Sequence, residues 1–180
     1  MLNFPPYTYA EDSALLGRFL SSIKQPGDLL EIGVGNGGNL SLALQNGRFK
    51  NITGTDILHL TSVRHDLPRS IELIKADAAT CFRPESFDIV AFNPPYVPSE
   101  EIIDPATDGG KGGVEIPLRF LSGALNVLRD DGIVVMILSS EDSLDALEHY
   151  CQNKNLEIKK VGQTPLFFET LVLFVINRRK

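Results

Sequence analysis

The chain has 180 residues, 43% of them hydrophobic, and a formal net charge of −6, which is typical of one soluble globular domain. It contains no run of about 18 apolar residues, so no membrane span is predicted, and its start lacks the pattern of a signal peptide. The acidic balance argues against extensive contact with nucleic-acid phosphates. Two cysteines and three scattered histidines predict no disulfide framework and no metal site, and they fit a reducing cytosol.

Helices and strands are predicted to alternate along the chain. Glu11-Asp12-Ser13 can cap a helix that ends at Pro26-Gly27. Further helices are predicted at residues 39–44, at 114–128 and after a cap at 140–142. Apolar runs predict strands at residues 28–32, 52–56, 71–75, 87–92, 133–138, 156–161 and 169–176.

This order predicts an α/β fold with a doubly wound, seven-stranded and mostly parallel sheet in a three-layer α/β/α sandwich. The last two strands lie too close in sequence for a crossover helix, so the last strand is expected to be antiparallel. We expect a single domain over residues 1–180, with residues 1–27 as an N-terminal extension and helix. Residues 97–113 form a long loop rich in Gly, Pro and acids, which is usually functional or mobile, and we expect it to contact the substrate.

A glycine loop directly follows the strand at 28–32. Gly33, Gly35 and Gly38 satisfy Gly-x-Gly-x-x-Gly, and Asp56 ends the next strand about 20 residues on, as a ribose-binding acid does. The glycines permit positive φ and close approach of a ligand to the backbone. By itself this pattern fits a nicotinamide dinucleotide equally well, so an NAD-dependent oxidoreductase is an alternative.

Two further acids favour a cationic, adenine-containing ligand. Glu31 lies inside an apolar strand, where a carboxylate is costly without a partner, and the ammonium and sulfonium of S-adenosylmethionine would supply one. Asp77 follows the third strand and suits an adenine amino group. The alternatives are that Glu31 pairs with a core Lys or the backbone, that Asp56 is a turn acid, and that Asp77 caps a helix.

The stretch Asn93-Pro94-Pro95-Tyr96 follows the strand at 87–92. The prolines end the strand in a rigid, extended form and hold Asn93 at the sheet edge where ligands bind in open α/β sheets. The Asn side chain and the next carbonyl offer acceptors to an incoming –NH2 group, and Tyr96 adds a flat wall. This favours a methyltransferase acting on a planar nitrogen, although a proline-rich turn is the simpler interpretation.

These motifs resemble the class I methyltransferases, and among them the release-factor glutamine methyltransferases. Residues 30–37 resemble the cofactor loop of that family, and residues 93–96 match its substrate signature. Residues 10–16 and 109–115 resemble segments of its archaeal–eukaryotic branch, so the likeness covers nearly the whole chain. The sequence departs from the family in having no Trp before the Gly-Gly-Lys segment.

The resemblance implies the roles of individual residues. S-adenosylmethionine, which leaves as S-adenosylhomocysteine, would contact these residues: Ser13, Glu31, Gly33, Gly35, Asp56, Asp77, Ala78 and Asn93. Asp56 would hold the ribose, Asp77 and the backbone of Ala78 the adenine. Asn93, Pro94, Pro95 and Tyr96 would bind the acceptor amide, with Asn93, Pro94 and Tyr96 taking part in catalysis.

The resemblance also implies partners. The acceptor would be a glutamine of a class 1 release factor in the cytoplasm, and a small zinc-binding activator protein is expected at the strand 71–75. Adenine N6 or guanine N2 of a nucleic acid is the alternative acceptor, ranked second because the loop after Tyr96 is acidic. A cofactor-binding module without activity is a third alternative, against which the intact Asn93 speaks.

Overall fold

The computed structural model describes residues 11–58, 60–139, 144–167 and 169–179. For residues 11–13 it describes the backbone alone. The main sheet consists of seven strands, and their order is β3-β2-β1-β4-β7-β9-β8. Their bounds are β1 (Gly27–Ile32), β2 (Phe49–Asp56), β3 (Ile71–Lys75), β4 (Phe87–Phe92), β7 (Leu128–Ser139), β8 (Leu156–Pro165) and β9 (Thr170–Arg178). β9 runs antiparallel to both of its neighbours, β7 and β8, and the other described pairs in this sheet are parallel. The predicted fold class is therefore confirmed.

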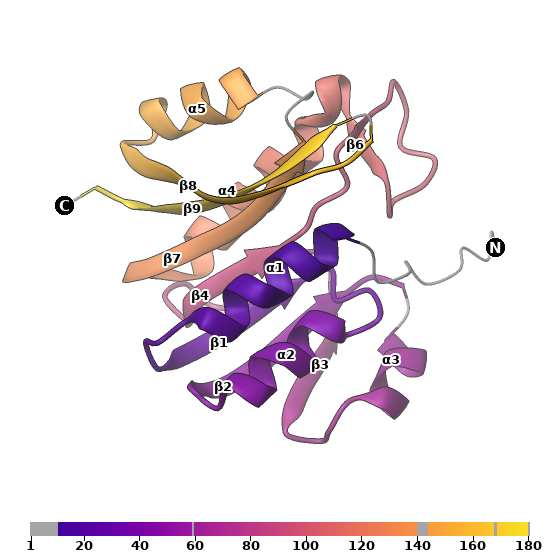
Figure 1. Ribbon diagram of the computed structural model, residues 1–180, viewed down its shortest axis with the longest axis vertical. Helices are drawn as coiled ribbons and strands as arrows, with labels where there is room; N and C mark the ends of the chain where they lie inside the picture. Colours follow the sequence, from indigo (N-terminus) through magenta and orange to yellow (C-terminus); the bar gives the residue numbers. More distant parts are fainter. Residues whose placement is uncertain (1–10, 59, 140–143, 168, 180) are drawn as a thin grey trace.

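Helices cover both faces of the sheet because successive residues of the central strands point to opposite sides. Leu29 packs with residues of α1 (Glu11–Ser22), α2 (Gly38–Asn46) and α3 (Leu60–Asp66). Leu30 packs with residues of α4 (Glu115–Val127) and α5 (Leu144–Asn153). Figure 1 shows α1 and α2 in front of the strands and α4 behind them. None of the described helices is long and apolar enough to cross a membrane.

The order of the strands in the sheet creates an opening at their carboxyl ends. From β1 the chain passes to β2 and β3 on one side, and then returns to β4 and β7 on the other (Figure 1). The connections after β1 and β4 therefore leave in opposite directions, which creates a crevice at the carboxyl ends of these two strands. The glycine loop and Asn93 both lie at that point.

Two local predictions need correction, and a third concerns residues that the structure does not describe. The segment 97–113 is not an unstructured loop: it contains β5 (Val97–Pro98), β6 (Asp108–Gly110) and a 3-10 turn, η1 (Lys111–Gly113). The strand predicted at residues 133–138 begins earlier, because β7 starts at Leu128, and its register with β4 jumps from Phe87↔Leu128 to Ile89↔Ile133. The cap predicted at residues 140–142 lies outside the described residues.

The C-terminal strand is joined to the end of α4 by one arginine. Arg178 donates from Nη2 to the carbonyl of Leu125 at 2.8 Å, and from Nη1 to the carbonyls of Leu128 and Arg129 at 3.2 Å each. The last turn of a helix leaves carbonyls without intrahelical partners, and the N–H groups of the Arg178 guanidinium donate to carbonyls at this end of α4. This fixes α4, whose other end borders the crevice.

Candidate active site

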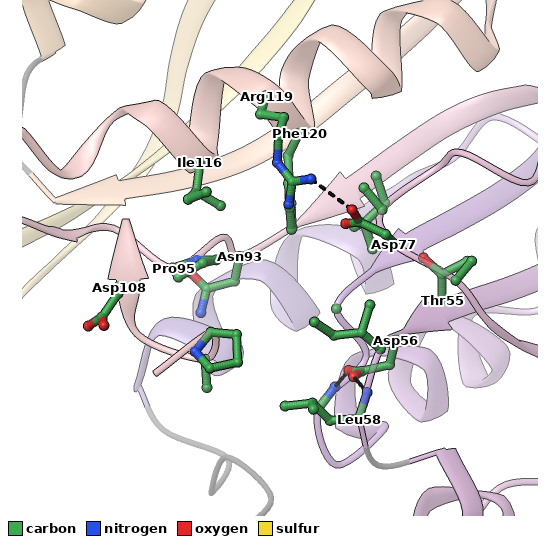
Figure 2. Close-up of a pocket in the computed structure, with 18 of the residues that line it drawn as sticks. Thr55, Asp56, Leu58, Asp77, Asn93, Pro95, Asp108, Ile116, Arg119 and Phe120 are labelled. Atoms are coloured by element: carbon green, nitrogen blue, oxygen red, sulfur yellow. Dashed lines mark hydrogen bonds and ion pairs between the residues drawn. The ribbon is translucent and has the colours of Figure 1, made fainter. Parts of the chain in front are cut away.

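A cavity of about 160 Å³ opens at the carboxyl ends of β1, β2, β3 and β4. Figure 2 shows Asn93, Asp56 and Asp77 arranged around it, with Ile116, Arg119 and Phe120 reaching in from α4. The segment after β5 contributes Ile102, Ala106 and Asp108 to the wall. The cavity therefore joins strand ends, the 97–113 segment and α4.

The glycine loop forms one side of this cavity. Gly33 and Gly35 have φ of 74° and 52°, a conformation that residues with a Cβ adopt only with strain. A Cβ built on either residue would meet no atom within 4 Å, so the backbone borders open space. Such an exposed glycine backbone fits close approach by a ligand, as the sequence pattern predicts.

Asp56 holds the glycine loop in place while facing the cavity. Its Oδ2 accepts a hydrogen bond from the Gly35 N–H at 3.2 Å, and its Oδ1 accepts one from the Leu58 N–H at 2.8 Å. Each carboxylate oxygen has a second lone pair, so both can still accept from ribose hydroxyls. Asp56 is therefore more than a turn acid, because it organises two loops at the cavity.

Glu31 is buried beneath the glycine loop and is not among the residues that line the cavity. Its Oε1 accepts a hydrogen bond from Asn39 Nδ2 at 2.8 Å, so its partner is neither a lysine nor the backbone. Among the described residues its Oε2 has no hydrogen-bond partner. Burial, reinforced by the charge of Asp56 and opposed by the Asn39 hydrogen bond, raises the pKa of Glu31 to about 8. A cation next to Oε2 would remove this penalty.

Asp77 lies in the cavity wall, where it does not cap a helix. Residues 77–82 form turns and no helix, so the helix-cap interpretation is wrong. The carboxylate instead pairs with Arg119 of α4, Nη1 to Oδ2 at 2.8 Å. The next residue, Ala78, has a φ of 49°, a backbone strain of the kind that clusters at ligand sites.

A second, smaller cavity of about 90 Å³ adjoins the first. It is lined by residues 93–97 together with Ala106 and Thr107. Asn93, Pro95 and Ala106 line both cavities, so Asn93 lies at the boundary between them. The structure thus brings the substrate signature to the same opening as the glycine loop, Asp56 and Asp77.

Gly109 explains why the Gly-Gly-Lys segment lies next to the signature. A Cβ on Gly109 would be 2.7 Å from Tyr96 Cα and 2.8 Å from Gly113 O, distances that side chains essentially never adopt. The segment is closed further by the Val97 N–H, which donates to Thr107 O at 2.9 Å. Tyr96 and Gly109 therefore form one packed unit beside the smaller cavity.

Two acids keep the intervening loop in shape. Asp108 Oδ2 accepts the N–H groups of Asp104 and Ile103 at 2.8 Å each, and these bonds hold the pKa of Asp108 below its usual value. Asp104 Oδ1 in turn accepts the Ala106 N–H at 2.9 Å. These hydrogen bonds place Ala106 between the two cavities.

One predicted site residue cannot be compared with the structure, and several residues that line the cavity were not predicted. Ser13 lies in α1, but its predicted cofactor contact concerns a side chain outside the described part. Sequence reasoning missed the cavity residues that come from the loop and from α4: Ile102, Ala106, Asp108, Ile116, Arg119 and Phe120. No group of His, Cys, Asp and Glu residues in the described ranges could hold a metal ion.

The fold, the glycine loop and the cavity at the switch point define a class I methyltransferase, and comparisons with known proteins agree. Residues 30–94 match the methyltransferase domain family. A Methanocaldococcus jannaschii protein named "Putative protein N5-glutamine methyltransferase" is 35% identical over 153 residues, which covers 74% of this chain and 72% of the relative. The chain therefore belongs to the protein N5-glutamine methyltransferase family, that is, to the release-factor glutamine methyltransferases, and S-adenosylmethionine is its methyl donor.

Solved structures share the fold over nearly the whole chain. The E. cuniculi Mtq2–Trm112 complex, responsible for methylation of the eRF1 translation termination factor, matches with a TM-score of 0.80 and 22% identity, covering 98% of this chain and 100% of that chain. A Burkholderia thailandensis 1,6-didemethyltoxoflavin-N1-methyltransferase with bound S-adenosylhomocysteine matches with a TM-score of 0.62 and 14% identity, covering 94% and 80%. The matched family is a methyltransferase family, so it does not support the alternative of an NAD-dependent oxidoreductase.

Proposed function

We propose that the protein methylates the side-chain amide nitrogen of a glutamine in a class 1 release factor, and that residues 1–180 act as a single methyltransferase domain. The observation that carries this proposal is the pair of adjoining cavities that share Asn93, Pro95 and Ala106. One cavity has the features of a nucleoside site, and the other is bounded by the substrate signature. The archaeal relative and the E. cuniculi complex support the same acceptor chemistry.

The larger cavity would hold the cofactor through its strand-end acids. Asp56 would accept hydrogen bonds from the ribose hydroxyls, and Asp77 with the backbone of Ala78 would meet the adenine edge. Gly33 and Gly35 would let the cofactor lie against the backbone, while Ser13 and Glu31 would serve its methionine end. S-adenosylmethionine supplies a methyl group on a positively charged sulfur and leaves as a neutral thioether.

The smaller cavity would hold the acceptor amide. An amide nitrogen is a poor nucleophile because its lone pair is delocalised, so orientation and hydrogen bonding must raise its reactivity. The side-chain oxygen of Asn93 and the carbonyl of Pro94 would accept its two N–H bonds and stabilise positive charge as it develops on nitrogen. Tyr96 would pack against the amide plane, with Pro95 as the wall shared with the cofactor. One proton then leaves the nitrogen for solvent.

A small, zinc-binding activator protein would bind at β3. In the seven-stranded sheet β3 pairs only with β2, so its other side offers backbone groups for strand addition. The Mtq2 of the E. cuniculi complex also works with a partner, Trm112. Such a role in translation would place the protein in the cytoplasm.

A methyl-transfer assay with three acceptors tests the proposal. Tritiated S-adenosylmethionine is offered with a release factor, a DNA oligomer and a structured RNA, each with and without a small zinc-binding partner, and the labelled residue is identified by mass spectrometry. We expect label on a glutamine of the release factor. Label on a purine amino group of either nucleic acid would overturn the acceptor, and no transfer to any substrate in either condition would overturn the enzyme activity.

Variants separate the two cavities. Asn93→Ala should abolish transfer and leave the calorimetric affinity for S-adenosylhomocysteine within about threefold. Asp56→Ala should instead weaken that affinity by about 1–3 kcal/mol, the loss of one set of charge-assisted hydrogen bonds. Wild-type activity in Asn93→Ala, or unchanged affinity in Asp56→Ala, would reject the respective role.

A further inference from the structure

The ion pair between Asp77 and Arg119 links α4 to the turn after β3 across 42 positions of the sequence. Both side chains are about half exposed, 52% for Arg119 and 50% for Asp77. An ion pair this exposed contributes little to folding, because water solvates both charges in the unfolded and the folded chain. The geometry of the pair is therefore better explained by what it does to the cavity that both residues line.

Arg119 occupies only one of the two carboxylate oxygens of Asp77. The 2.8 Å contact joins Nη1 to Oδ2, and within the described part of the chain no other side chain bonds the carboxylate. Its Oδ1 is thus left to accept a hydrogen bond. Figure 2 shows the guanidinium of Arg119 reaching from α4 to the carboxylate on the side of the cavity opposite Asn93.

Arg119 is itself held in position by α4. Its guanidinium carbon lies 5.4 Å from the ring centroid of Phe120, within the range of a cation–π contact. Phe120 and Ile116 flank it on the same helix and also line the cavity. A side chain fixed in this way defines one orientation for the carboxylate that it binds.

We propose that Arg119 is a positioning residue for the adenine end of the cofactor: it orients Asp77 so that Oδ1 faces the cavity and selects a ligand with an exocyclic amino group. This inference rests on the proposed placement of adenine at Asp77. An amino group donates to Oδ1, whereas a carbonyl oxygen at the same position presents an acceptor to an acceptor. Since Nη1 of Arg119 already bonds Oδ2, Oδ1 is the carboxylate oxygen that is left for the amino group.

Calorimetry with two ligands tests the role. S-adenosylhomocysteine has a 6-amino group and an N1 acceptor on its purine ring, whereas its analogue S-inosylhomocysteine has a 6-oxo group and an N1–H donor. We expect wild-type protein to prefer the amino ligand by about tenfold or more, the value of a charge-assisted hydrogen bond. Arg119→Gln should weaken the amino ligand by about tenfold and the inosine analogue by less than about threefold, so that the preference is largely lost.

Two further single variants and one double variant separate positioning from general support of α4. Arg119→Lys keeps the charge but has no planar fork, so it should retain part of the preference. Asp77→Asn should lose the preference for the amino ligand. The double variant with Arg119→Gln should bind S-adenosylhomocysteine and S-inosylhomocysteine as Asp77→Asn alone does. Lys159→Gln, which breaks an exposed pair with Glu157 on β8, is the matched control and should bind both ligands as wild type does.

The outcomes distinguish this inference from the proposed function. Equal weakening of both ligands by Arg119→Gln would mean that Arg119 only supports the helix, and an unchanged preference would mean that it plays no part; either result overturns the inference and leaves the methyltransferase intact. Failure of wild-type protein to bind S-adenosylhomocysteine would overturn the cofactor site itself.

Discussion

Gly109→Ala should detach the 97–113 segment from the substrate signature. The added Cβ would lie 2.7 Å from Tyr96 Cα and 2.8 Å from both Tyr96 C and Gly113 O. All three atoms belong to the backbone, so no side-chain rotation relieves the contact. The segment must move away from Tyr96 by several tenths of an ångström, and the smaller cavity between them must change shape.

The size of the effect follows from the cost of overpacking. Inserting one methyl group against packed backbone costs about 1–3 kcal/mol, which corresponds to about 5- to 150-fold in an equilibrium or a rate. We expect the loss to appear in kcat/KM for the acceptor protein, because Gly109 contacts Tyr96 and not the glycine loop. The affinity for S-adenosylhomocysteine should change by less than about threefold, since the strand-end acids Asp56 and Asp77 do not move.

The chain provides a matched control in Gly123, which lies in α4 and where a Cβ would meet no atom within 4 Å. Gly123→Ala should leave activity unchanged and raise the free energy of unfolding by about 0.5–1 kcal/mol, the difference in helix propensity. The assay measures methyl transfer to the release factor alongside calorimetry and urea unfolding. Wild-type kcat/KM in Gly109→Ala would refute the packing argument.

Two further predictions concern stability. Arg178→Ala should lower the free energy of unfolding by about 1–3 kcal/mol, because the carbonyls of Leu125, Leu128 and Arg129 lose a charged donor; urea unfolding measures this, and an unchanged midpoint would contradict it. Glu31→Gln should become progressively more stable than wild type between pH 4.5 and 8, by up to about 1.4 kcal/mol per pH unit. The sign follows because the folded carboxyl keeps its proton up to a pKa of about 8, whereas the unfolded one loses it near 4.5, so wild-type stability is lost as pH rises. If the free energies of unfolding of the two proteins changed in parallel over this pH range, the Glu31 carboxyl would not be the cause of the pH dependence.

The sheet and the cavity at its edge could be predicted because their signals are local. Each central strand is a short apolar run followed at once by a special residue, such as Gly33 after β1 or Asn93 after β4. Proline at residues 94 and 95 ends β4 by its own stereochemistry, so the position of Asn93 follows from its neighbours in sequence. The edge position of β3 agrees with the same reasoning about strand order.

The partners of the acids could not be predicted in the same way. Arg119 meets Asp77 only because α4 packs across the sheet, and nothing near either residue in the sequence indicates the other. Asn39 is different: it lies in the first turn of the helix after the glycine loop, eight residues from Glu31. A polar side chain on the buried face of that helix was a usable signal for a partner of Glu31.

The segment 97–113 was misjudged because its order depends on non-local hydrogen bonds and on side chains that accept backbone N–H groups. The bond from Val97 N to Thr107 O joins residues ten positions apart, and Asp104 and Asp108 accept three of the N–H groups between them. Neither device produces the periodicity by which helices and strands are recognised. Gly, Pro and acids therefore indicated a loop where the structure has two short strands and a 3-10 turn.

The wall between the two cavities also bears on which acceptor fits. Pro94 and Pro95 have no N–H, so this stretch of backbone can accept hydrogen bonds but cannot donate them. With Asn93 presenting its side-chain oxygen, a glutamine amide with two N–H donors would be bound, and a glutamate carboxylate would meet acceptors only. The fixed φ of both prolines keeps the wall from moving, and a displacement of about 1 Å at such a boundary can cost about 100-fold in rate. The same two prolines would thus select an amide and hold it beside the methyl donor.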